Sequence, residues 1–254
     1  MEPEKTTPTA GTVGAGNREM GGRPIYSHSS TPNSSPQEGV LTDRHLAMLQ
    51  SSAITSEAIA ARGYRSLRGG DGAYASLEAL GFTHKQAIAV ASRDVLVLPI
   101  RPPDGTNGLY MIRPDNPRVF DDKDHPLGDG TYRQTVLKYE QPRGASNRLD
   151  VNPLALPGLA DPNKDLWFTE GIKKGDALTS AGLVGVSLPG GVYGFLGKNA
   201  YGASTVLADF EHIAWKVGDG SPRRVFIVFD SDVMQKQPVK QALDEARLTP
   251  ALDL

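Results

Sequence analysis

The spacing of apolar positions changes once between residues 41 and 140. Up to residue 93, apolar residues recur at helical spacing in short stretches that begin near Ser, Thr or Asp. We expect helices at 42–49, 55–63, 74–80 and 83–91. From Val95 the apolar positions run together or alternate. This predicts a hairpin of strands 95–100 and 109–113 and then, after a long polar loop, a third strand at 135–139.

Strands and helices alternate in the last third of the chain. The pattern predicts strands at 166–169, 183–187 and 224–229 and helices at 172–181, 203–216 and 236–247. Such alternation is typical of a parallel sheet with right-handed crossovers. Three strands make a small sheet with two edges to cover, so the C-terminus looks cut short. Residues 153–162 resemble a linker into this region.

Residues 1–40 lack the periodic pattern and are rich in Gly, Pro, Ser and Thr, which predicts a disordered leader. The remaining chain is apolar enough for real cores, since 39% of all 254 residues are hydrophobic. We predict an α/β protein: a small α+β subdomain, and after it a parallel sheet with flanking helices.

Composition excludes several classes of protein. The chain contains no cysteine, which removes disulfides, thiolate catalysis and Cys-ligated zinc, and its five histidines show no metal-binding spacing. The formal net charge of −2 gives no global basic field, so any contact with nucleic acid must be local. No apolar run approaches the ~20 residues of a membrane span and no secretory signal is present, so we expect a cytoplasmic protein.

Three carboxylates come directly after predicted strands. Glu170 follows the run Leu166–Thr169, and Asp230 and Asp232 follow Val225–Phe229. The carboxyl ends of parallel strands meet at the edge where open α/β sheets bind ligands, and oxygen ligands suit magnesium or manganese. We therefore predict a metal site made of all three acids. The alternative is that these acids only end strands or cap the helices that follow.

Basic residues accompany the acids. Lys173 and Lys174 lie at the start of the helix after Glu170 and are placed to contact phosphate together with its free N–H groups. A basic lip of Lys138, Arg113, Arg118 and Arg143 would hold a nucleic-acid backbone, with Tyr110 and Tyr139 stacking on bases. The alternative is a solvated helix start and ordinary surface pairs.

The segment Thr169–Leu178, with Gly182 and Val186–Gly191 after it, resembles the first half of a Toprim domain, the catalytic module of primases, topoisomerases and some nucleases. Phe229–Asp232 resembles the Asp-x-Asp motif of that family. The upstream strands resemble the basic subdomain that precedes Toprim in primases. Taken together, these segments resemble the uncharacterised Toprim-like family of plasmid, phage and integrative-element replication proteins. Three departures are Val233 and Met234 after Asp232, the missing zinc-binding domain, and the chain end before the last Toprim strand.

Composition and pattern divide the chain into a leader (1–40), a helical module (41–93), an α+β subdomain with linker (94–162) and a C-terminal domain (163–254). The resemblance implies that the third part is a basic subdomain and that the last is a Toprim-like domain. It implies that Asp230 and Asp232 hold one or two Mg²⁺ (or Mn²⁺) ions and that Glu170 is a further ligand or a general base. The leading hypothesis is primase-type nucleotidyl transfer. The first alternative is a non-catalytic nucleic-acid-binding or interaction module. The second, ranked below it, is a metal-dependent nuclease. Expected partners are single-stranded DNA and a helicase or primase module on another chain.

Overall fold

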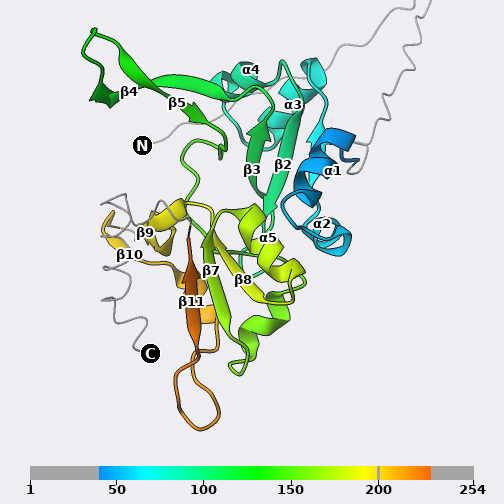
Figure 1. The fold of residues 1–254 in the computed structure, drawn as a ribbon, viewed down its shortest axis with the longest axis vertical. Helices are drawn as coiled ribbons and strands as arrows, with labels where there is room; N and C mark the ends of the chain where they lie inside the picture. The colour runs from blue at the N-terminus through cyan, green and yellow to red at the C-terminus, as the bar shows by residue number, and fades with distance from the viewer. Residues whose placement is uncertain (1–39, 199–200, 230–254) are drawn as a thin grey trace, which may run out of the picture. The chain divides into compact units, whose positions relative to one another are not determined.

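The computed structural model describes residues 40–198 and 201–229, all of which fall in one compact unit. The protein is α/β, as predicted (Figure 1). It has a three-stranded antiparallel sheet with the order β1-β2-β3 and a four-stranded sheet with the order β11-β7-β8-β6. Two further strand pairs, β4-β5 and β9-β10, lie outside these sheets. None of the described helices is long and apolar enough to cross a membrane.

The four expected helices of the first half are present. They are α1 (Asp43–Gln50), α2 (Ser56–Arg62), α3 (Asp71–Ala79) and α4 (His84–Val90). Threonine side chains cap three of them, because Thr42, Thr55 and Thr83 accept a backbone N–H of the first turn. Polar caps before short apolar stretches are a local signal, which is why the sequence alone was sufficient here.

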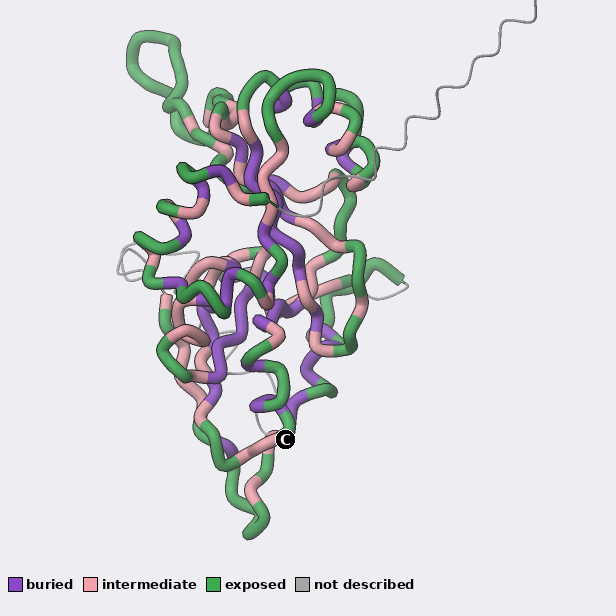
Figure 2. Tube along the Cα trace, turned by 90° about the vertical axis from the view of Figure 1, so that its right-hand side faces the viewer, coloured by how far each residue is buried: buried purple, intermediate pink, exposed green. Residues whose placement is uncertain are grey.

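The first sheet lies between the helices. It contains β1 (Arg65–Leu67), β2 (Val95–Ile100) and β3 (Leu109–Pro114). Every residue of β2 is buried, because Val95 and Val97 pack against α3 and α4 while Leu96 and Leu98 pack against α1 and α2. Burial on both faces explains the unbroken apolar run of this strand. Figure 2 shows such buried stretches running through the middle of the trace, with exposed residues around them.

The second sheet contains β6 (Asp150–Val151), β7 (Leu166–Glu170), β8 (Val184–Leu188) and β11 (Val225–Val228). The last three are parallel, and β6 adds an antiparallel strand at one edge. Helix α5 (Ile172–Ser180) connects β7 to β8, as expected from the alternation. The predicted helix 236–247 lies outside the described residues.

Four predictions of local structure were wrong. The helix expected at 203–216 is replaced by the pair β9 (Leu196–Lys198) and β10 (Ser204–Val206) and the 3₁₀ turn η3 (Ala208–His212). Its buried residues Leu207, Phe210 and Ile213 recur every third position, which fits a 3₁₀ turn as well as a helix. The expected linker 153–162 instead contains the turn η1 (Leu156–Ala160) and contributes Leu159 to the core.

The other two errors concern strands. The expected polar loop contains β4 (Arg118–Pro126), which pairs with β5 (Tyr132–Leu137), the strand expected at 135–139. Neither strand has a buried face, so no alternation marked β4. The expected helical module also contains β1, three half-buried residues that pair with β2. The turn η2 (Gly191–Phe195) completes the described elements.

His45 on α1 is a buried imidazole. Its Nε2 lies 3.3 Å from Asp115 Oδ1, and because a carboxylate oxygen only accepts, Nε2–H is the donor. Its Nδ1 lies 2.7 Å from Ser66 Oγ, which also accepts the Thr42 N–H at 2.9 Å. Burial lowers the pKa of His45 below its ordinary value, although Asp115 opposes this shift.

We expect stability to fall as the pH drops from 7.5 to 5.5. Below the ordinary histidine pKa of about 6.5 the unfolded chain takes up a proton that folded His45 resists, at a cost of at most about 1.4 kcal/mol per pH unit. Urea melts at both pH values should show the loss, and His45→Gln should reduce it. The exposed His84 supplies the control, since His84→Gln should leave the difference between the two melts as it was.

Candidate nucleotide and nucleic-acid site

A cleft of about 500 Å³ lies at the carboxyl ends of β7 and β8. One side is formed by the sheet edge and the start of α5, with Glu170, Gly171, Lys173, Lys174, Leu188 and Pro189. The other side is formed by Ser52, Met111 and Tyr139 from the first half of the chain. The cleft thus lies where open α/β sheets bind ligands, and both halves of the unit contribute to it.

The strand that leads to the two aspartates is the neighbour of the strand that carries Glu170. β11 pairs with β7 in parallel, with Val228 opposite Thr169, and β7 pairs with β8 in parallel, with Glu170 opposite Leu188. All three strands therefore end at one edge of the sheet. Asp230 and Asp232 lie outside the described residues. Within the described part of the chain no group of three His, Asp or Glu side chains is arranged to hold a metal ion.

Gly171 turns the chain from β7 into α5. Its φ of 78° lies in the left-handed region that favours glycine. Gly171 is the N-cap residue of α5 and has no side chain, so no N-cap side chain accepts an N–H of the first turn. The start of α5 therefore faces the cleft with backbone donors and the positive end of the helix dipole, which suits an anion.

The side chains around this helix start carry both signs of charge. Lys174 Nζ donates to Glu170 Oε1 at 2.9 Å, one turn back. Lys173 is half-buried, and the loss of water lowers its pKa, with a further contribution from the positive charge of Arg113 on β3. Two cations that disfavour each other's charge would both gain from an anion placed between them.

Two glycines let α5 lie very close to β8. A methyl group on Gly175 would come within 2.0 Å of Ser187 Oγ, and one on Gly185 within 2.6 Å of the Gly175 carbonyl oxygen. Larger residues would push the helix away from the sheet. The helix start is thereby fixed over the strand edge that ends in Glu170.

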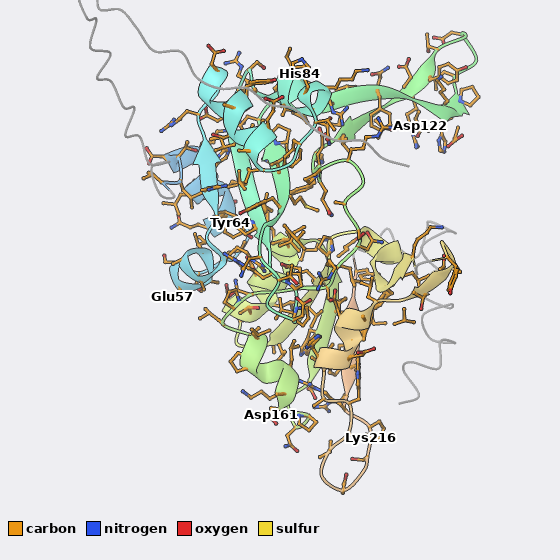
Figure 3. All side chains as sticks on the ribbon, turned by 180° about the vertical axis from the view of Figure 1, so that it is seen from behind. Glu57, Tyr64, His84, Asp122, Asp161 and Lys216 are labelled. Carbon is orange, nitrogen blue, oxygen red and sulfur yellow. The ribbon has the colours of Figure 1, made fainter. Side chains whose placement is uncertain are left out.

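A buried ionic network fixes α5 from its other side. Arg62 of α2 donates from Nε and Nη2 to Asp176 of α5, at 3.1 and 2.5 Å, and from Nη1 to Asp150 of β6. The side chains of all three residues have no exposed area. Tyr64 Oη and Asn152 Nδ2 also donate to Asp176, at 2.7 and 2.9 Å. Figure 3 shows Tyr64 near the junction of the two halves.

The protonation of this network follows from its burial. Burial raises the pKa of Asp150, against the pull of Arg62, and raises that of Tyr64 well above its ordinary value. Burial alone would lower the pKa of Arg62, but the two carboxylates raise it above its ordinary value, so Arg62 stays charged. The network holds one cation, Arg62, between two carboxylates and uses none of the groups that face the cleft.

The structure brings some predicted site residues together and separates others. Glu170, Lys173 and Lys174 line the cleft, and Arg113 acts electrostatically on Lys173. Lys138 is exposed and precedes Tyr139, which lines the cleft. Two members of the expected lip lie elsewhere: Arg118 is paired with buried Glu140, and Arg143 lines a second cleft. Tyr110 packs under Arg65, whose Cζ lies 5.6 Å from its ring centre.

Sequence reasoning missed Arg62 and Asp150. An arginine in the last turn of an amphipathic helix looks like an ordinary surface cation, and Asp150 falls in a polar stretch with no motif. Asp176 lies within the segment that resembles a Toprim domain, but no role was predicted for it. No local pattern carries such a signal, because the partners of Arg62 lie 88 and 114 residues away along the chain.

Comparison with known proteins gives a family match over part of the chain. The model of a domain of unknown function, DUF3854, matches residues 159–249, which include β7, α5, β8 and β11. No curated protein matches the sequence.

Several solved primase structures are similar in part. The Aquifex aeolicus primase (zinc-binding and RNA polymerase domains) has 14% identity and a TM-score of 0.46, with 83% of this chain and 47% of that chain covered. The DnaG primase catalytic domain bound to ssDNA has 17% identity and a TM-score of 0.46, with 82% and 59% covered. The chain thus spans about half of the first and three fifths of the second. At such identities and TM-scores neither likeness assigns a function to this chain.

Proposed function

We propose that this chain is a Toprim-like, primase-type replication protein that acts on nucleic acid at the carboxyl edge of β7 and β11, with magnesium or manganese. The observation that carries the proposal is the parallel pairing of β7 with β11 beside the uncapped start of α5. β11, the strand next to the one that carries Glu170, ends at Val228, two residues before Asp230 in the sequence.

The described residues give each part of the site a role. Glu170, with Asp230 and Asp232, would supply oxygen ligands, and the bound ion would neutralise charge on phosphate oxygens. Lys173, Arg113 and the N–H groups at the start of α5 would bind the phosphates of a nucleotide or strand end. Tyr139 on the opposite wall would stack on a base, and exposed Lys138 beside it would contact the backbone.

Glu170→Gln is expected to abolish primer synthesis. The assay is incubation of the chain with Mg²⁺ or Mn²⁺, a single-stranded template and labelled ribonucleotides, followed by gel separation. Removing a metal ligand or general base should lower product formation by about 10²–10⁴-fold. Glu211→Gln, at an exposed glutamate on η3, is the matched control and should retain activity. Product from both variants at wild-type level would remove Glu170 from the site.

One observation favours a second candidate, a binding module without catalysis. Lys174 donates to the Glu170 carboxylate at 2.9 Å. The positive charge beside this carboxylate is therefore a lysine, whereas a catalytic site would hold a metal ion there. In that case the wild-type chain would make no product at any metal concentration but would still retain single-stranded DNA. Retention should fall with rising salt, and Lys173→Ala should weaken it. Neither product nor retention would contradict both candidates.

A further inference from the structure

The ribbon formed by β4 and β5, residues 118–137, carries apolar side chains that nothing in the described chain covers. It extends away from the first sheet (Figure 1), and Asp122 lies on it (Figure 3). Val119 is 54% exposed, Phe120 48% and Val136 44%, and Val119 lies directly opposite Val136. A two-stranded ribbon is only marginally stable alone, so these residues call for a covering surface.

Charge is distributed unevenly along the ribbon. Its tip, residues 121–131, contains four aspartates and one lysine. Asp122 is paired with Arg133 at 2.6 Å, but no cation of the described residues pairs with Asp121 or Asp124. The tip therefore presents net negative charge together with exposed Leu127.

The base of the ribbon borders a cleft of the opposite charge. This base cleft, of about 740 Å³, is lined by residues of α4, β4 and the segment after β5, among them Lys85, Arg118, Glu140 and Arg143. Glu140 holds Arg118 through two bonds of 2.9 and 2.5 Å. Lys85 and Arg143 are exposed and are left to supply the positive charge of the cleft.

We propose that the ribbon is a dimerisation element, and that its partner is a second copy of this chain lying antiparallel to it. In a two-fold pair the acidic tip of each ribbon enters the base cleft of the other, and the apolar face with Val119 and Val136 packs against the same face of the other ribbon. A nucleic-acid backbone would match Lys85 and Arg143 but would leave those apolar faces exposed and would meet the aspartates of the tip. The second copy satisfies both features.

Charge reversal tests the proposal in the full-length chain. Light scattering after size-exclusion chromatography should give twice the chain mass for the wild type. The tip variant Asp121→Lys/Asp124→Lys and the cleft variant Lys85→Glu/Arg143→Glu should each run at the monomer mass. Combining all four changes restores complementarity and should restore the dimer. Far-UV circular dichroism of each variant shows whether it is folded, and the rescue is independent of any loss of stability in one variant.

Cross-linking gives a second measurement, because the natural chain has no cysteine. Asp124→Cys and Arg143→Cys chains, mixed and oxidised, should form a disulfide-linked pair. Neither chain oxidised alone should form it at the same rate. Within one ribbon Asp124 lies roughly 20 Å from the base at about 3.3 Å per residue, well beyond the ~7 Å that a disulfide spans. A monomeric wild type without cross-linking overturns the proposal. So does a cleft variant that loses DNA retention while the wild type is monomeric, since the cleft then binds nucleic acid.

Discussion

Replacing Arg62 with methionine is expected to lower the free energy of unfolding by about 3–5 kcal/mol, because it leaves Asp150 and Asp176 buried without their cation. The side chain of Arg62 has no exposed area and joins α2 to both β6 and α5. Methionine fills similar space, so the loss measures charge and hydrogen bonding more than cavity formation. Urea denaturation followed by circular dichroism gives the value.

Two variants separate this effect from a general sensitivity of the fold. Arg68→Met removes a surface arginine that is 76% exposed and paired with Asp94 at 3.3 Å, and it should leave the unfolding midpoint nearly unchanged. Adding Asp150→Asn and Asp176→Asn to Arg62→Met removes the uncompensated charges and should recover part of the loss. An Arg62→Met chain as stable as the wild type would show that the network contributes nothing.

Arg223→Met is expected to cost about 3 kcal/mol, because it deprives four carbonyl oxygens, two of them on buried residues, of their donor at once. The Arg223 guanidinium donates to the carbonyl oxygens of Gly158, Leu159, Lys164 and Ala214, at 2.7 to 3.1 Å. No carboxylate of the described residues bonds to it, and burial lowers its pKa. The loss would loosen the start of β11 and the turn η1 together.

The neighbouring arginine provides a matched control. Arg224 is 72% exposed and pairs with Asp165 at 2.7 Å, so Arg224→Met should leave the melting temperature close to that of the wild type. Thermal melts of the two variants under one condition make the comparison. Equal shifts for both would mean that the carbonyl contacts of Arg223 do not account for its effect.

The parts of the fold that could be predicted from the sequence are those marked by local patterns of residues. Capping threonines marked the first helices, and the unbroken run of β2 marked a strand buried on both faces. β7, α5 and β8 were predicted from period and from the glycines at their ends. The position of Glu170 beside a cleft follows from the same local pattern.

What the sequence did not predict depends on partners far away along the chain. Asp150 looks like a loop residue until β6 pairs with β8 and Arg62 donates to it. β4 has no buried face, so its sequence lacks the alternation of apolar and polar residues that marks a strand. The spacing of Leu207, Phe210 and Ile213 fits two kinds of helix, and only the packing against the second sheet decides between them. Asp230 and Asp232 lie outside the described residues and remain a prediction.

The place of β11 in its sheet also sets an order of folding. β7 and β8 are joined through α5 alone, so their pairing closes a short loop, whereas β11 reaches the other side of β7 only after residues 189–224. Long loops close late because more chain entropy is lost before any contact forms. Within this sheet β11 is therefore expected to pair with β7 after β8 has done so. Trp167 stacks on Phe226 of β11 with ring centres 4.2 Å apart, so its fluorescence is expected to report that pairing.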